Sequence, residues 1–209
     1  MYEFTTLGWL RHVIFHPLEG FEDLRWKKRG SIGLSLIIVV LLFVAMVVDR
    51  QLKGFAFNTA YVKVFNVVPL IVQSFVYFFV WVIGNWAVCT LFDGEGTLKN
   101  ICIYSAYAIV PYIFGVYLAT FISNFLILDE AIWVNFISYI GLGWSVILMI
   151  QAMKAVHQYS LFKTILSILG TLIAMLLILF LAVLLLSLFQ QVYVFIYSLY
   201  TEIAYRIRG

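Results

Sequence analysis

Hydrophobic residues occupy five long runs along the chain, and short polar segments separate these runs. The runs cover Ser31–Val48, Phe65–Leu91, Ile101–Leu128, Ile132–Met153 and Leu161–Phe189. Charged residues are almost absent from them, and a helix of about 20 such residues is long enough to cross the hydrocarbon core of a bilayer. We therefore expect an all-α membrane protein whose main part is a bundle of five transmembrane helices.

The segment before the first run predicts an N-terminal interfacial amphipathic helix. Residues Pro17–Arg29 carry acidic side chains early and basic side chains late, which suits the dipole of a helix. Apolar residues recur every three positions, so one face would sink into the headgroup region while the charges stay in water. The residues expected at the lipid interface are Phe21, Trp26, Lys27, Lys28 and Arg29. Such a helix anchors the first span or, alternatively, docks a cytoplasmic partner or an acidic lipid.

The chain beyond the last run predicts an aromatic C-terminal helical extension. Tyr193, Tyr197 and Tyr200 follow the i, i+4, i+7 spacing of one helix face. A single helix over Ser160–Arg206 would reach about 70 Å, which is longer than a whole bilayer of about 40–45 Å. We therefore expect a bend near Gln190 that lays the tail flat. The tyrosines then serve as an interfacial belt or as candidate contacts with a partner protein.

Basic residues favour one orientation across the membrane. Eight lysines and arginines fall on the side of the N-terminus and five on the other side. The positive-inside rule therefore predicts a cytoplasmic N-terminus and, after five spans, an external C-terminus.

Prolines and glycines mark irregular points in the predicted bundle. Pro69 and Pro111 lie inside the second and third runs, where each is expected to kink its helix. The connection between these runs is a glycine-rich turn, and we expect unusual backbone conformations at its two glycines and a helix cap at its threonine. The residues of this cytoplasmic turn are Gly94, Gly96, Thr97 and Lys99.

The sequence gives no support for catalysis. No acid or base lies near the centre of a run, which argues against an ion-coupled carrier. His12 and His16 have i, i+4 spacing, but this alone is a weak metal signal, and no hydrolase or nucleotide-binding motif is present. We expect no enzyme activity, no metal, no cofactor and no nucleic-acid partner.

Several landmarks taken together resemble the Yip1 domain family of five-span membrane proteins. They are His16-Pro17 followed by Phe21, the turn Gly94–Asn100 running into Tyr104–Pro111, the pair Gly143-Trp144, and the segment Val156–Lys163. The resemblance implies a five-span domain with a cytoplasmic N-terminus. It does not carry over the GTPase role of eukaryotic members, because their D-L-Y-G-P signature is absent here, and the short form resembles bacterial members.

These observations divide the chain into three parts and lead to three functional hypotheses. The parts are a cytoplasmic amphipathic segment (1–30), a Yip1-like five-span domain (31–189) and an external interfacial helical tail (190–209). The leading hypothesis is a non-catalytic accessory or scaffold subunit in the bacterial plasma membrane that packs against another integral membrane protein, such as a transport complex. The alternatives are an autonomous membrane-shaping or lipid-organising protein, and a pore or carrier in its own right.

Overall fold

The computed structural model describes residues 5–27, 30–58 and 65–208. All regular structure in these residues is helical, in the order α1 (Thr6–Phe15), α2 (Gly20–Trp26), α3 (Ile32–Leu52), α4 (Val68–Ile71), the π-helical η1 (Val72–Val76), α5 (Tyr77–Leu91), α6 (Leu98–Ala108), α7 (Val110–Ser123), the 3-10 turn η2 (Leu128–Glu130), α8 (Ala131–His157) and α9 (Leu161–Arg208). Five helical segments among them are long and apolar enough to cross a membrane. The expected all-α, five-span fold class is confirmed.

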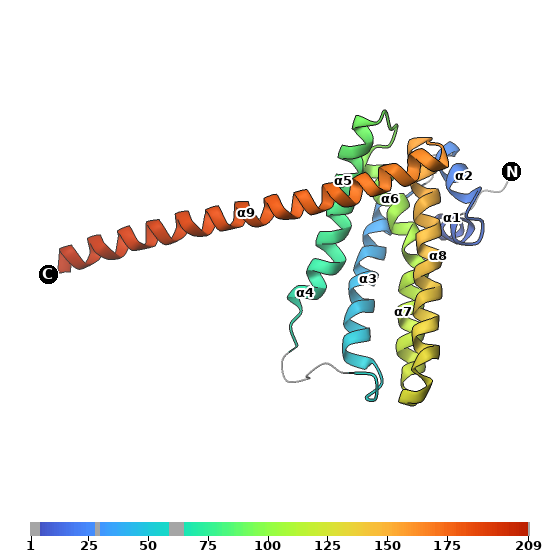
Figure 1. Cartoon of the computed structure of the whole chain (residues 1–209), viewed down its shortest axis with the longest axis horizontal. Coiled ribbons are helices and arrows are strands. Elements are labelled where there is room, and N and C mark those ends of the chain that lie inside the picture. Colours follow the sequence, from blue (N-terminus) through green and yellow to red (C-terminus); the bar gives the residue numbers. More distant parts are fainter. Residues whose placement is uncertain (1–4, 28–29, 59–64, 209) are drawn as a thin grey trace.

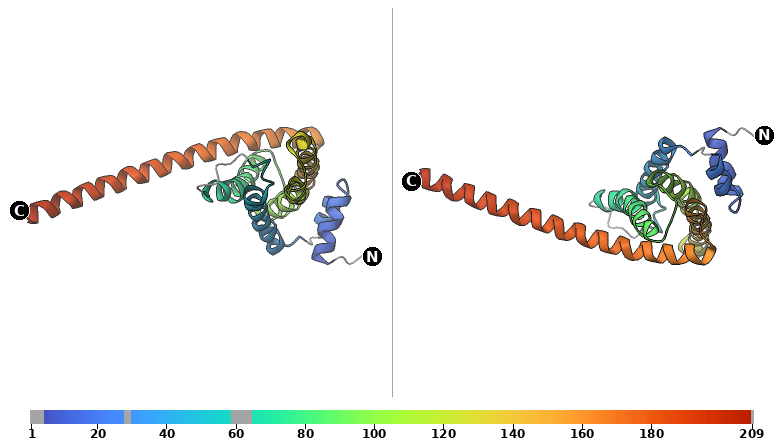
Figure 2. Two further views of the ribbon diagram at one scale, coloured as in Figure 1. Left: turned by 90° about the horizontal axis from the view of Figure 1, so that it is seen from below. Right: turned by 90° about the horizontal axis from the view of Figure 1, so that it is seen from above.

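Four of the apolar segments lie alongside one another, and the fifth runs across them. The bundle consists of α3, α4–α5, α6–α7 and α8, whereas α9 leaves one end of it crosswise (Figure 1). Views along the bundle show α9 extending far to one side (Figure 2). We call the end of the bundle that carries the turns at 92–97 and 158–160 the turn end, and the end that carries the connections after α3 and α7 the far end.

The third span forms the core of the bundle. In its most apolar stretch 56% of the residues are buried, compared with 0% in that of α9. The α6 part, with its fully buried Ile101 and Tyr107, contributes to a hydrophobic core shared with α3 and α8. The α7 part contacts α8 closely where Gly115 faces Gly141, because a Cβ on Gly141 would lie only 3.0 Å from the Gly115 Cα. Small residues at that point let the two backbones approach, as is usual for helices in membranes.

The third span is interrupted near its proline, and a side chain of the neighbouring helix accepts a backbone hydrogen bond there. α6 ends at Ala108 and α7 begins at Val110, with Pro111 in its first turn. The N–H of Tyr112 donates a hydrogen bond to the Ser145 hydroxyl of α8 at 2.8 Å. Such a partner is needed because an unpaired backbone amide is costly in lipid.

The expected kink at Pro69 does not occur in the middle of a helix. The second span begins at Val68, so Pro69 occupies the first helical turn, where its missing N–H would have no helical partner in any case. The irregularity of this span follows instead in η1, where the buried Ser74 donates to the Leu70 carbonyl at 2.7 Å.

The expected bend near Gln190 is wrong. α9 continues unbroken through Gln190 and Gln191 to Arg208, a length of about 70 Å. No proline or glycine follows Gly170 before Gly209, so nothing in this stretch opposes the helical backbone bonds. A bend was expected because the helix is longer than a bilayer is thick, but local helix formation keeps this stretch unbroken.

Candidate functional site

The turn at 92–97 is held against the end of α8 by close backbone contact. A Cβ on Gly94 would lie 2.5 Å from His157 Nδ1 and 2.7 Å from the Tyr159 hydroxyl, and a Cβ on Gly96 would lie 2.5 Å from His157 Cε1. The expectation of unusual glycine conformations is wrong, because the positive φ in this turn, 56°, belongs to Asp93. These glycines are required by the space between the turn and α8 rather than by their backbone angles.

The last part of the turn starts α6 as expected. The Thr97 hydroxyl accepts the N–H of Asn100 at 3.3 Å and caps the helix. Lys99 follows in the first helical turn, and its side chain is exposed.

His157 joins three spans through a buried chain of hydrogen bonds. The N–H of Gly96 donates to His157 Nδ1 at 3.3 Å, and His157 Nε2 lies 2.9 Å from Asn85 Oδ1. Because Nδ1 acts as acceptor, the ring proton is assigned to Nε2, which donates to Asn85. The Asn85 amide donates in turn to the Thr171 hydroxyl at 3.1 Å. Residues of α5, α8 and α9 are therefore fixed to one another by groups that are almost fully buried.

Tyr159 caps the end of α5. Its hydroxyl lies 3.1 Å from the Cys89 carbonyl and 2.9 Å from the Phe92 carbonyl, groups that a helix end leaves without helical partners. Burial raises the pKa of this hydroxyl, so Tyr159 stays protonated and donates. Its ring stacks on His157, with 5.3 Å between the ring centroids. The ammonium of Lys163, which belongs to α9, lies 4.3 Å from the centre of the Tyr159 ring.

Arg25 ties the N-terminal helices to the same end of the bundle. Its guanidinium donates to the carbonyls of Ala155 and Val156 at 2.7 and 3.3 Å and to Glu95 of the turn at 2.5 Å. The two carbonyls belong to the last turn of α8, where the helix dipole favours a positive charge. A single side chain therefore connects α2, α8 and the turn at 92–97.

The N-terminal helices pack on protein where a lipid contact was expected. Phe21 is only 1% exposed, and its ring lies 5.7 Å from that of Tyr104 in α6, so its assignment to the lipid interface is wrong. The helix containing it begins at Gly20 and is too short to present one continuous apolar stripe outward. Trp26 is 77% exposed, and the Lys27 ammonium lies 5.0 Å from the centre of the Trp9 ring.

The expected lipid contacts of Lys28 and Arg29 lie outside the described residues.

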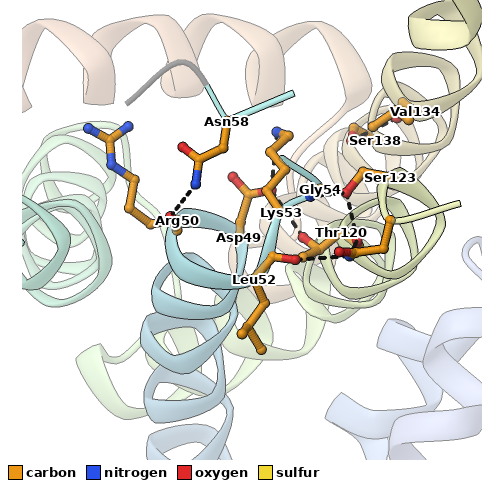
Figure 3. Close-up of polar contacts among 11 residues, drawn as sticks. Asp49, Arg50, Leu52, Lys53, Gly54, Asn58, Thr120, Ser123, Val134 and Ser138 are labelled. Carbon is orange, nitrogen blue, oxygen red and sulfur yellow. Dashed lines mark hydrogen bonds and ion pairs between the residues drawn. The ribbon is translucent and has the colours of Figure 1, made fainter. Parts of the chain in front are cut away.

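A second polar cluster closes the far end of the bundle (Figure 3). The Asp49 carboxylate of α3 accepts from the Thr120 hydroxyl of α7 at 3.0 Å and lies 3.2 Å from the Lys53 ammonium. The N–H of Gly54 donates to the Ser123 hydroxyl at 2.8 Å. A Cβ on Gly54 would overlap the Ser123 carbonyl, so this contact also depends on glycine. The cluster joins the ends of α3 and α7 and performs a structural role.

The three tyrosines of the tail lie on α9 far from the bundle. Tyr193 and Tyr197 stack with 6.3 Å between ring centroids, and Tyr193, Tyr197 and Tyr200 are 68%, 59% and 69% exposed. The structure does not bring them near the turn at 92–97 or the N-terminal helices.

Reasoning from sequence did not identify the polar network at the turn end. His157 and Tyr159 entered only as members of the segment Val156–Lys163, and Arg25 was not singled out. One signal was available, because Asn85 is among the few polar side chains inside a hydrophobic run, and such residues in a membrane need a partner.

The comparison with known proteins agrees with this architecture. No curated protein and no solved structure matches the chain significantly. The Yip1 domain matches residues 11–184, which include α2, the turn end with its polar network and all four apolar segments of the bundle. This stretch is most of the chain, and the chain therefore belongs to the Yip1 domain family.

Proposed function

We propose that this protein is a non-catalytic membrane subunit that packs against another integral membrane protein, such as a transport complex. The observation that carries the proposal is the exposure of α9. Its buried residues are Thr164, Ser167 and Thr171, near its start, and every residue from 180 to 200 is exposed. No residue from 172 to 207 is buried, so more than half of this 48-residue helix is without cover from the described part of the chain.

Lipid alone does not suit the distal half of α9. Ser187, Gln190, Gln191 and Ser198 follow i, i+3, i+4, i+11 spacing and share one side of the helix. Amide and hydroxyl groups inside a bilayer are stable when they bond across to a neighbouring helix. The tyrosine stripe lies beside this polar side. We infer that a transmembrane helix of the partner, with polar side chains of its own, packs here.

The polar network at the turn end supports a structural rather than a catalytic role. Among the described residues, no buried side-chain nitrogen or oxygen lacks a hydrogen-bond partner. His157 uses both ring nitrogens to hold neighbouring elements, and Asn85 is engaged in the same chain of bonds. A general base needs a nitrogen or oxygen free to take a proton from a substrate.

We further propose that the protein resides in the bacterial plasma membrane with its N-terminus in the cytoplasm. The excess of basic residues around the turn end supports this orientation. An external C-terminus would require α9 to stand across the bilayer beside the partner helix in the native complex, whereas here α9 runs crosswise to the bundle (Figure 1).

Site-specific photo-cross-linking in native membranes tests the partner contact. A benzophenone amino acid replaces Tyr197 in α9 or, as the control, Phe114 in α7, which is 66% exposed on the bundle. We expect a discrete protein adduct from position 197 and no such adduct from position 114. Lipid adducts alone at both positions would contradict the proposal.

A further inference from the structure

A polar cavity opens at the turn end, between α2, the start of the first span and the first turn of α6. Its volume is about 490 Å³, and its polar lining comes from Arg25, Lys99, Asn100 and Tyr104. The exposed Trp26 forms one edge. None of these groups takes part in the proposed contact of α9, so the cavity is separate from that contact.

The cavity is positively charged. The Glu95 carboxylate offsets part of the Arg25 charge, whereas Lys99 forms no ion pair with any described residue. Lys99 and Asn100 lie in the first turn of α6, an 11-residue helix whose N-terminal dipole adds further positive potential. Arg25 is held rigidly by two carbonyls of α8, so its charge is fixed beside the cavity before any ligand arrives.

The walls of the cavity are fixed by close packing. A Cβ on Gly30 would lie 2.7 Å from Ile103 Cγ2, so the chain entering the first span passes directly against α6. The next residue continues this contact, because the N–H of Ser31 lies 3.4 Å from the Tyr107 hydroxyl. Tyr104 of the lining is 4% exposed, and its ring is held against that of Phe21, with 5.7 Å between the ring centroids.

We propose that this cavity binds the phosphate group of an anionic phospholipid headgroup. A lysine, an asparagine amide and a helix N-terminus are together suited to phosphate oxygens. The cavity lies at one end of the apolar bundle, at the level where headgroups meet water, and the exposed indole of Trp26 is a typical interfacial side chain. The same chemistry would accept a soluble phosphate ester, so the test separates the two sources.

Native mass spectrometry of the full-length protein in detergent provides the test. The probes are phosphatidylglycerol, phosphatidylcholine and glycerol 1-phosphate, each titrated separately. The variants are Lys99→Gln, Lys99→Arg and, as a control of equal charge change, Arg11→Gln. Arg11 is exposed on α1 and does not line this cavity.

We expect phosphatidylglycerol to bind more tightly than phosphatidylcholine. Lys99→Gln should weaken phosphatidylglycerol binding about fivefold, the usual effect of one basic residue near an anionic headgroup, while Lys99→Arg and Arg11→Gln leave it within twofold. Binding of glycerol 1-phosphate that is as tight and as sensitive to Lys99→Gln would overturn the lipid assignment in favour of a soluble ligand. Equal losses for Lys99→Gln and Arg11→Gln, or no preference between the two lipids, would overturn the site altogether.

Discussion

The contact between the turn at 92–97 and α8 makes a specific prediction for Gly96→Ala. The new methyl group would lie 2.5 Å from His157 Cε1 and 2.9 Å from Val156 Cγ1, so the turn must move away from α8. Overpacking of this kind costs about 1–3 kcal/mol, and displacement of the Gly96 N–H from His157 Nδ1 costs about 1 kcal/mol more. We expect the free energy of unfolding to fall by about 2–4 kcal/mol.

The chain carries its own probes for this measurement. Cys89 and Cys102 are both free and buried, so a thiol-reactive dye reports unfolding as they become exposed. At about 2–4 °C per kcal/mol for a protein of this size, the melting temperature should fall by about 4–16 °C. Gly143→Ala is the matched control, because nothing lies within 4 Å of its added Cβ. That variant should leave the melting temperature unchanged or raise it slightly, since alanine is a better helix former than glycine.

A double-mutant cycle separates crowding from backbone strain. If crowding against the imidazole is the cause, Gly96→Ala should cost clearly less in a His157→Ala background than in the native chain, because two of the three nearest atoms belong to His157. If Gly96→Ala costs the same in both backgrounds, within about 0.5 kcal/mol, this reasoning is refuted and the loss of stability comes from backbone conformation.

Three further experiments test the contacts at the turn end and the topology of the chain. Asn85→Leu leaves the buried Nε2–H of His157 without its acceptor and should lower the free energy of unfolding by about 1–3 kcal/mol, measured by the same dye assay; an unchanged melting temperature would show that the bond contributes nothing. Arg25→Gln should release α2 from α8 and speed chymotrypsin cleavage of the N-terminal helices while the bundle stays intact, because three hydrogen bonds are lost; an unchanged cleavage rate would count against that attachment. For topology, single cysteines placed at 93–99 in a cysteine-free background should react only from the cytoplasm and those at 52–58 only from outside; the reverse pattern would overturn the orientation.

The spans could be predicted from sequence because their signal is composition over a long window. Any helix in the hydrocarbon core must be apolar for about 20 residues, and the five runs show this directly. The N-cap at Thr97 could also be predicted from sequence, because a capping hydroxyl bonds to a backbone N–H only three residues further along the chain.

The polar network could not be predicted in the same way, because its members are distant in sequence. Arg25 and the carbonyl of Ala155 are 130 residues apart, and Asn85 and His157 are 72 apart. Only the packing of the helices reveals that Gly94 and Gly96 face an imidazole and a phenol, so the sequence suggested backbone freedom as the reason for these glycines. The amphipathic pattern of α2 was also ambiguous, because an apolar stripe packs equally well on lipid or on a neighbouring helix such as α6.

Truncation of the tail tests the central claim, that α9 docks this protein onto another membrane protein, most directly. Deletion of Tyr193–Gly209 removes the tyrosine stripe and leaves the bundle and the buried part of α9 in place. Solubilisation in mild detergent followed by quantitative mass spectrometry should then show the truncated protein inserted at normal levels but depleted of an integral membrane protein that co-purifies with the full-length chain. Recovery of the same partner at the full-length level, or a full-length chain that purifies strictly alone, would contradict the account.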